Sequence, residues 1–280
     1  MSSVEGTGSA GTAFPAGGPL RPIRLALLSL RLGLLHALQY RTDFWIAALQ
    51  SMVGLATSLA GLAVVFSQTD DLGGWQSDEL VALVGVFMIV AGLLGLVVRP
   101  SLERLMEGIR LGTLDFDLTK PVDAQLMVSV RQVEIWRLID VILGSGILVY
   151  AIGRLGERVG PVQALSFAVL LVAGVAIIYS FLLVLATFSF WLVRLENIMV
   201  IFGSMYEAGR WPIGIYPPWL RVALTVAVPV AFAITIPVES LLGRLEPATV
   251  VVAIVIAAAF LGGSRWFWRF GLRHYTGASA

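Results

Sequence analysis

The 280-residue chain has no cysteine and only two histidines. Without cysteine it has neither disulfide bonds nor thiolate metal or redox sites. His36 and His274 lie near opposite ends of the chain, and no HExxH pair is present for a zinc site. No GxSxG is present for an acyl-transfer nucleophile either. We therefore expect no metal site and no catalytic residue of these kinds.

Charge is also scarce, since charged residues make up only 13% of the chain and hydrophobic residues 58%, with a mean hydropathy of +0.89. Soluble domains carry about 25% charged residues. The composition therefore predicts an all-α integral membrane protein whose apolar spans of about 20 residues lie in a lipid bilayer. A net charge of +1 gives no indication of nucleic acid binding, and none is predicted.

The chain has a single lysine, and its position excludes one kind of ATP site. A Walker A loop ends in Gly-Lys-Ser/Thr, whereas Lys120 is followed by Pro121. The sequence therefore contains no P-loop. Any ATP hydrolysis that drives this protein must take place on a second polypeptide.

Apolar runs separated by short polar segments predict six membrane spans. Residues 1–19 lack the basic and apolar regions of a cleaved signal peptide and are predicted to be a disordered tail, and 20–280 a single membrane domain. Within 20–42, Arg24 and Arg31 are seven residues apart and share one helical face. This favours an amphipathic helix at the cytoplasmic lipid surface, with a membrane span as the alternative.

The clear spans cover residues 44–67, 80–98, 135–152, 164–193 and 248–264. Gly54 and Gly61 give the first span a small-residue spacing that allows close helix contact. The second span is expected to stop at Arg99-Pro100. Arg137 and Asp140, three residues apart at the start of the third span, are expected to form a local ion pair rather than a transport site.

The region 197–246 allows two arrangements. Either 198–208 is a short fifth span followed by a broken re-entrant element over 211–246, or 197–220 is a loop followed by a straight span over 221–242. Five prolines between Pro212 and Pro237 argue against one straight helix. Irregular backbone is tolerated at membrane depth where protein covers it, and we favour the re-entrant arrangement.

The longest polar stretch runs from Arg99 to Arg137. Most basic residues fall on the same side of the spans as this stretch, which places it and both termini in the cytoplasm under either arrangement of 197–246. Four apolar residues in it follow helical spacing and predict one stripe along a short helix: Leu102, Leu105, Met106 and Ile109. Such a helix docks in a groove on a soluble partner or lies on the lipid surface, and the periodicity fits both.

Residues Gly112–Val122, GTLDFDLTKPV, resemble the Gly-Thr-Leu-acid…Pro signature between the second and third spans of ABC-2 type transporter permeases. Trp211–Leu220, WPIGIYPPWL, followed by Val228-Pro229, resembles the Pro…Tyr-Pro…Leu-Pro segment of the same family. The basic N-terminal helix and Arg194-Leu-Glu-Asn are also similar to family features. The resemblance covers about residues 20–275 and departs from the usual pattern at Asp115-Phe-Asp, where a single Glu is common.

The resemblance implies the permease subunit of an ATP-driven exporter in the cell membrane, working as a homodimer or heterodimer. Two copies of an ATP-binding subunit, which hold the ATP and Mg, are implied as partners, and this chain binds no cofactor. The segment 99–134 would contain the cytoplasmic coupling helix that seats in the ATPase. Its implied residues are Leu102, Leu105, Met106, Ile109, Gly112, Thr113, Leu114, Asp115, Phe116, Lys120 and Pro121.

The segment 211–246 would form the outer gate between spans five and six. The implied gate residues are Arg210, Trp211, Pro212, Tyr216, Pro217, Pro218, Trp219 and Pro229. Because the spans are rich in Leu, Val, Phe and Gly, a hydrophobic or amphipathic cargo such as a lipid, drug or natural product is expected. The alternative is a six-span membrane enzyme or scaffold without an ATPase partner, for which Asp115-Phe-Asp offers only a bare DxD pattern.

Overall fold

The computed structural model describes residues 41–119, 123–156, 159–192 and 197–275. The predicted tail and all but the last two residues of the predicted interfacial helix lie outside these ranges. The described residues form helices joined by turns and loops and contain no strand, only one isolated bridge between Leu72 and Trp75. The predicted all-α class is confirmed.

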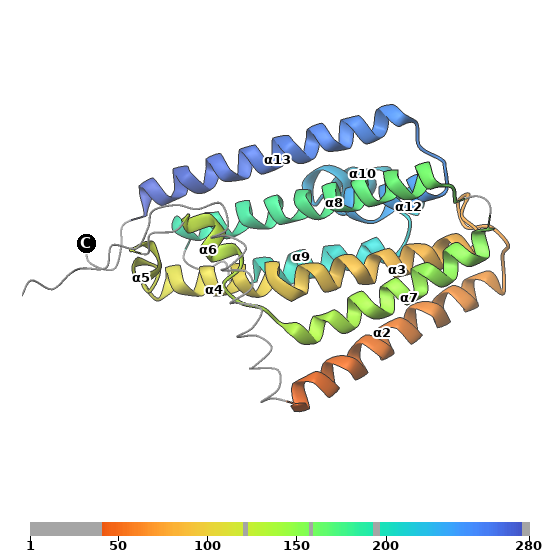
Figure 1. Cartoon of the computed structure of the whole chain (residues 1–280), viewed down its shortest axis with the longest axis horizontal. Coiled ribbons are helices and arrows are strands. Elements are labelled where there is room, and N and C mark those ends of the chain that lie inside the picture. The colour runs from red at the N-terminus through yellow and green to blue at the C-terminus, as the bar shows by residue number, and fades with distance from the viewer. Residues whose placement is uncertain (1–40, 120–122, 157–158, 193–196, 276–280) are drawn as a thin grey trace, which may run out of the picture.

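Among the described residues, five helical stretches are long and apolar enough to cross a membrane. They contain the helices α2 (Arg41–Phe66), α3 (Ser77–Leu93), α7 (Leu138–Leu155), α8 (Pro161–Thr187) and α13 (Pro247–His274). These helices run side by side along the long axis of the molecule, with α13 and α2 at opposite edges (Figure 1). Residues 67–76 and 242–246 lie at one end of the bundle, called here the loop end. The opposite end is called the α4 end.

Glycines bring α3 and α7 together. A Cβ atom on Gly85 would lie 2.9 Å from the carbonyl oxygen of Gly144, and one on Gly144 would lie 2.7 Å from the carbonyl oxygen of Gly85. No side chain fits between the two backbones, so this pair sets the closest approach of the two helices. Gly54 and Gly61, which were expected to make close contacts, face open space in the described chain.

The second span is longer than predicted. The helix does not stop at Arg99-Pro100 but continues through a π turn, η1 (Leu94–Val98), into α4 (Arg99–Arg110). The backbone N–H of Arg99 donates to the carbonyl of Leu94, five residues back. This wider turn is where the helix accommodates Pro100, which has no N–H to donate. A single stretch of 34 helical residues, Ser77–Arg110, therefore reaches the α4 end.

Between α8 and α13, the described residues form only short helices. α9 (Ile198–Glu207) is followed by the 3-10 turns η5 (Ala208–Arg210) and η6 (Ile213–Ile215). Then α10 (Pro218–Val222) and the π turn η7 (Ala223–Ala227) bend by 71° into α11 (Val230–Ala233) and α12 (Thr235–Leu241). The alternative of a straight span over 221–242 is wrong, because Pro229 interrupts the helix inside it.

The path of 213–244 is re-entrant. Ile215 lies against Gly73 and Arg244 is paired with Glu79, so both ends of the segment are at the loop end. Between them, the backbone of Phe232 and Ala233 packs on Gly174, near the middle of α8. The segment therefore enters and leaves the bundle at the same end, as the favoured arrangement predicted.

Candidate functional site

The segment after α4 turns back on itself at Gly112. Gly112 has φ +67°, a left-handed conformation that glycine adopts without strain. The N–H groups of Thr113 and Leu114 both donate to the carbonyl of Gly108, at 2.9 and 3.3 Å. This closes the end of α4 and starts the short helices α5 (Asp115–Leu118) and α6 (Ala124–Ser129).

The predicted apolar stripe of this segment exists, but it faces inward. Leu102, Leu105 and Leu114 have no exposed surface, and Met106 and Ile109 are partly buried against the same core. Leu102, Leu105 and Leu114 therefore have no surface to offer an ATPase in this arrangement, because α4 packs against the protein's own α6 and α8. The coupling role of the partly buried Met106 and Ile109 stays a prediction.

Other side chains of the segment do face outward. Leu111 is 58% exposed and Phe116 75% exposed, and Arg110 and Thr113 beside them are also exposed. These four residues are called here the α4–α5 surface. Asp115 is half-buried at the start of α5. Lys120 and Pro121 lie outside the described residues.

Polar contacts join α6 to α8 and α13. The carboxylate of Asp123 accepts the N–H of Leu126 at the start of α6 and pairs with Arg265 of α13 at 2.8 Å. Partial burial raises the pKa of Asp123, but the Leu126 N–H and Arg265 outweigh it, so that the pKa lies below its usual value. Tyr179 of α8 makes hydrogen bonds with Gln125 and Ser129. These contacts would pass a movement of α6 directly to the spans α8 and α13.

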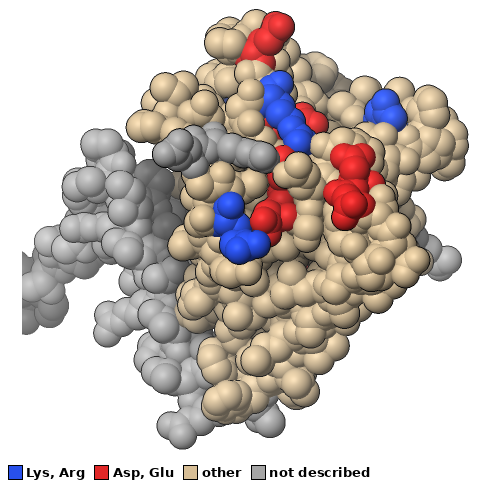
Figure 2. Space-filling model, turned by 90° about the vertical axis from the view of Figure 1, so that its right-hand side faces the viewer, with Lys and Arg blue, Asp and Glu red and all other residues tan. Residues whose placement is uncertain are grey.

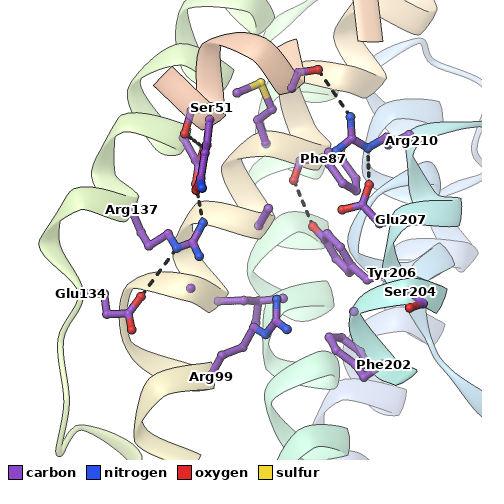
Figure 3. A pocket seen from close by; sticks show the side chains of 18 of the residues that line it. Ser51, Phe87, Arg99, Glu134, Arg137, Phe202, Ser204, Tyr206, Glu207 and Arg210 are labelled. Atoms are coloured by element: carbon purple, nitrogen blue, oxygen red, sulfur yellow. Dashed lines mark hydrogen bonds and ion pairs between the residues drawn. The ribbon is translucent and has the colours of Figure 1, made fainter. Parts of the chain in front are cut away.

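A cavity of about 600 Å³ lies between α2, α3 with α4, the start of α7, and α9 (Figure 3). Charged side chains are its unexpected feature. Its lining includes Arg99, Glu103, Glu134, Arg137, Asp140, Glu207 and Arg210. Charged groups among membrane helices are costly and mark functional positions.

One polar cluster lies where α7 begins. Ser51 of α2 donates a 2.5 Å hydrogen bond to Asp140, and Arg137 lies 3.7 Å from both Glu134 and Asp140. The predicted Arg137–Asp140 ion pair is confirmed, although it lines a cavity. Burial, with a smaller contribution from the charge of Glu103, raises the pKa of Glu134 against the opposing effect of Arg137.

The second polar cluster surrounds Arg210. Its guanidinium pairs with Glu207, donates to Ser58 at 2.7 Å and lies 4.9 Å above the ring of Phe87. Tyr206 donates to the carbonyl of Phe87 beside it. Arg210, which the resemblance implies as an outer-gate residue, points into the cavity from η5, ahead of the re-entrant segment. Ser51 and Ser58 are seven residues apart, which puts both on the face of α2 that lines the cavity.

The remaining predicted gate residues lie at or within the re-entrant segment. Pro217 and Pro218 begin α10, and Trp219 projects from it with 70% of its surface exposed. Pro229 is buried at the bend. The other three lie just before α10: Trp211, partly buried; Pro212, buried; and Tyr216, whose hydroxyl donates to Ala208.

An ion pair joins the end of the re-entrant segment to α3. Figure 2 shows the loop end, where acidic and basic side chains lie next to one another. The buried carboxylate of Glu79 accepts the N–H of Gln76 at the start of α3 and pairs with Arg244 at 2.7 Å. Arg244 also lies 5.0 Å above the ring of Trp75.

For an enzyme, the described residues offer little. No group of three or more His, Cys, Asp or Glu side chains in the part of the chain that the structure describes is placed to hold a metal ion. Asp115 begins α5, and the side chain of Asp117 is outside what the structure describes. No described site therefore supports the DxD interpretation.

Apolar helices long enough to cross a membrane, which run side by side and line a charged cavity, define a multi-span membrane protein. A family model described as ABC-2 family transporter protein matches residues 52–279, and the chain belongs to this family. The resemblance seen in the sequence is thereby confirmed. No curated protein and no solved structure matches the chain. The protein is thus a membrane permease whose family implies an ATP-binding partner.

Proposed function

We propose that this chain is the permease subunit of an ATP-driven exporter in the cell membrane. Two copies, or one copy with a similar permease, form the translocation pathway, and two ATP-binding subunits dock at the cytoplasmic α4 end. The family supports a transporter, and the absence of a P-loop from the given sequence fits an ATPase on a separate subunit. The observation that carries the proposal is the α4–α5 surface, which presents Leu111 and Phe116 to solvent.

The helix from Ser77 to Arg110 suits the transmission of force. Because α3, η1 and α4 are continuous, a push on the α4–α5 surface moves α3 as one body, and the contacts of Asp123 and Tyr179 carry the same push to α13 and α8. Both α3 and α9 line the cavity. Closure of the ATPases would therefore reshape the cavity and move its contents toward the re-entrant segment, which serves as the outer gate for a hydrophobic or amphipathic cargo.

Co-purification tests the proposal. The full chain is expressed with its neighbouring genes, solubilised and captured, and the captured complex is examined for a P-loop ATPase. We expect Leu111→Asp and Phe116→Asp each to weaken ATPase association by more than about 30-fold, the cost of losing a central interface side chain. Val162→Asp is the matched control, since Val162 is 73% exposed at the start of α8, near the loop end.

The membrane fold should survive these changes, because both side chains are exposed. Capture of the wild type without any P-loop ATPase would refute the exporter. Association unchanged in Leu111→Asp and Phe116→Asp, with an ATPase present in the wild type, would instead place the contact on another surface.

A further inference from the structure

Two arginines of the cavity keep hydrogen-bond donors free. Arg99 donates one long hydrogen bond, 3.4 Å, to the carbonyl of Met199, and no carboxylate of the described residues lies within ion-pair distance of it. The two carboxylates that form ion pairs with Arg137 are 3.7 Å away, beyond hydrogen-bond distance, and its buried Nε has no hydrogen-bond partner in the described chain. A guanidinium has five N–H donors, so most of these donors are available to a ligand.

Arg210 lines the same cavity but, unlike Arg99 and Arg137, has its hydrogen-bond donors occupied. Its donors are taken by Glu207, Ser58 and the carbonyl of Gly54, and its face covers Phe87. Arg210 is thus held by the bundle itself. Arg99 and Arg137 are not held in this way.

Two glycines leave space for the side chains of Arg99 and Arg137. A Cβ on Gly203 would lie 3.2 Å from Nη2 of Arg99, and a Cβ on Gly95 would lie 3.1 Å from the side chain of Arg137. A Cβ at either position would press on the arginine side chain, which would have to shift by a few tenths of an ångström. Small residues from α9 and η1 therefore shape this part of the cavity around the two charges.

Apolar side chains line the rest of the cavity wall near these arginines. Leu55 of α2, Met88 of α3 and Phe202 of α9 contribute to it. A cavity that combines cationic donors with an apolar wall fits a molecule that has an anionic end and an apolar body. Neither inorganic anions nor plain hydrocarbons would use both parts.

We propose that Arg99 and Arg137 bind the anionic headgroup of an amphiphile, a phosphate, sulfate or carboxylate, while Leu55, Met88 and Phe202 contact its apolar part. This names a substrate class for the proposed exporter and rests on that function for its physiological meaning. Charge-assisted hydrogen bonds from guanidinium to an oxyanion supply the selectivity. Glu134 and Asp140 flank Arg137, and Glu103 and Glu207 also line the cavity, so binding depends on the directed hydrogen-bond donors of Arg99 and Arg137 rather than on a net positive charge.

Lipid binding to the permease alone tests the site. The full chain in a non-ionic detergent is titrated with dioleoylphosphatidic acid, dioleoylphosphatidylcholine or inorganic phosphate, and bound ligand is measured by native mass spectrometry. We expect phosphatidic acid to bind about tenfold more tightly than phosphatidylcholine, and Arg99→Gln and Arg137→Gln each to lose about tenfold, the effect of one charge-assisted contact. Arg104→Gln is the control, because Arg104 lies on the same helix, exposed and paired with Glu107 outside the cavity.

A second pair of variants keeps the test valid if an arginine variant unfolds. Gly203→Ala crowds Arg99 and should also weaken phosphatidic acid binding, whereas Gly262→Ala, where a Cβ meets nothing within 4 Å, should not. Equal affinity for the two lipids, or loss in Arg104→Gln equal to that in Arg99→Gln, overturns the proposal. Inorganic phosphate that binds as tightly as phosphatidic acid overturns the apolar half of it. Because no ATPase is present in this experiment, these outcomes are independent of whether an ATPase co-purifies.

Discussion

At the scale of single residues, Glu79 has the most consequential position outside the cavity. It is 2% exposed, accepts the N–H of Gln76 at the start of α3 and pairs with Arg244 at the end of the re-entrant segment. One carboxylate thereby joins a span to the segment that we propose as the gate. A buried ion pair adds little net stability when intact, but removing one partner leaves the other uncompensated.

Glu79→Gln should therefore destabilise the protein by about 3 kcal/mol, the lower end of the cost of breaking a buried pair, because Arg244 remains partly exposed. Thermal unfolding of the purified chain in lipid nanodiscs measures the change. Asp78→Asn is the matched control, since the neighbouring Asp78–Arg154 pair is exposed on both sides and is worth about 0–1 kcal/mol. Equal effects of the two substitutions would show that the Glu79 pair has no special structural role.

At the scale of helices, the close contact between α3 and α7 depends on the absence of two side chains. Gly144→Ala would place a Cβ 2.7 Å from the carbonyl oxygen of Gly85 and 2.9 Å from the backbone nitrogen of Ile89. Since both neighbours are backbone atoms within helices, neither can move aside alone. The helices must separate, and the packing around them is lost.

We expect Gly144→Ala to lower the stability by about 2 kcal/mol, as overpacking typically does. Gly146→Ala, two residues along the same helix, meets nothing within 4 Å. It should be neutral or stabilising by up to about 1 kcal/mol, because alanine favours helix more than glycine does. Denaturant unfolding in mixed micelles compares the two. A Gly144→Ala protein as stable as Gly146→Ala would contradict the packing described here.

The contact between α3 and α7 also shows what the sequence could not predict about individual helices. Small residues at regular spacing indicated a close contact, but the spacing of Gly54 and Gly61 gave no information about which helix they face. The close contacts belong to Gly85, Gly144 and Gly174, whose partners are set by tertiary packing. For the same reason the stripe of Leu102 and Leu105 was recognised as helical, while its burial under α6 and α8 was not. Periodicity identifies an apolar face but not what covers it.

At the scale of the whole molecule, most of the architecture could be predicted because membrane spans are long and apolar. The cavity could not be, since its residues come from α2, α3, α4, α7 and α9 and are separated by up to 160 positions, from Gln50 to Arg210. Arg99 and Arg137 looked like ordinary basic residues at span ends. Only the fold shows that both face the same space with donors left free. The prolines of 211–246, by contrast, act locally and did predict a broken element.

A re-entrant path and a straight span predict different membrane faces for the residues near the two ends of the segment. Gly214 and Glu246 flank the segment, are both exposed, and lie at the loop end. A straight span over 221–242 would place them on opposite faces of the membrane, whereas a re-entrant segment places them on the same face. Because the chain has no cysteine, a single introduced thiol reports its position without background.

We therefore expect Gly214→Cys and Glu246→Cys to react with a membrane-impermeant maleimide added outside intact cells, and Leu111→Cys, exposed at the α4 end, to react only after the membrane is opened. A Cβ at position 214 meets nothing within 4 Å, so the substitution should not disturb the turn. Labelling of positions 246 and 214 from opposite faces would refute the re-entrant path. Labelling of all three positions from the outside would refute the bundle orientation, and with it an ATPase docked on the α4–α5 surface.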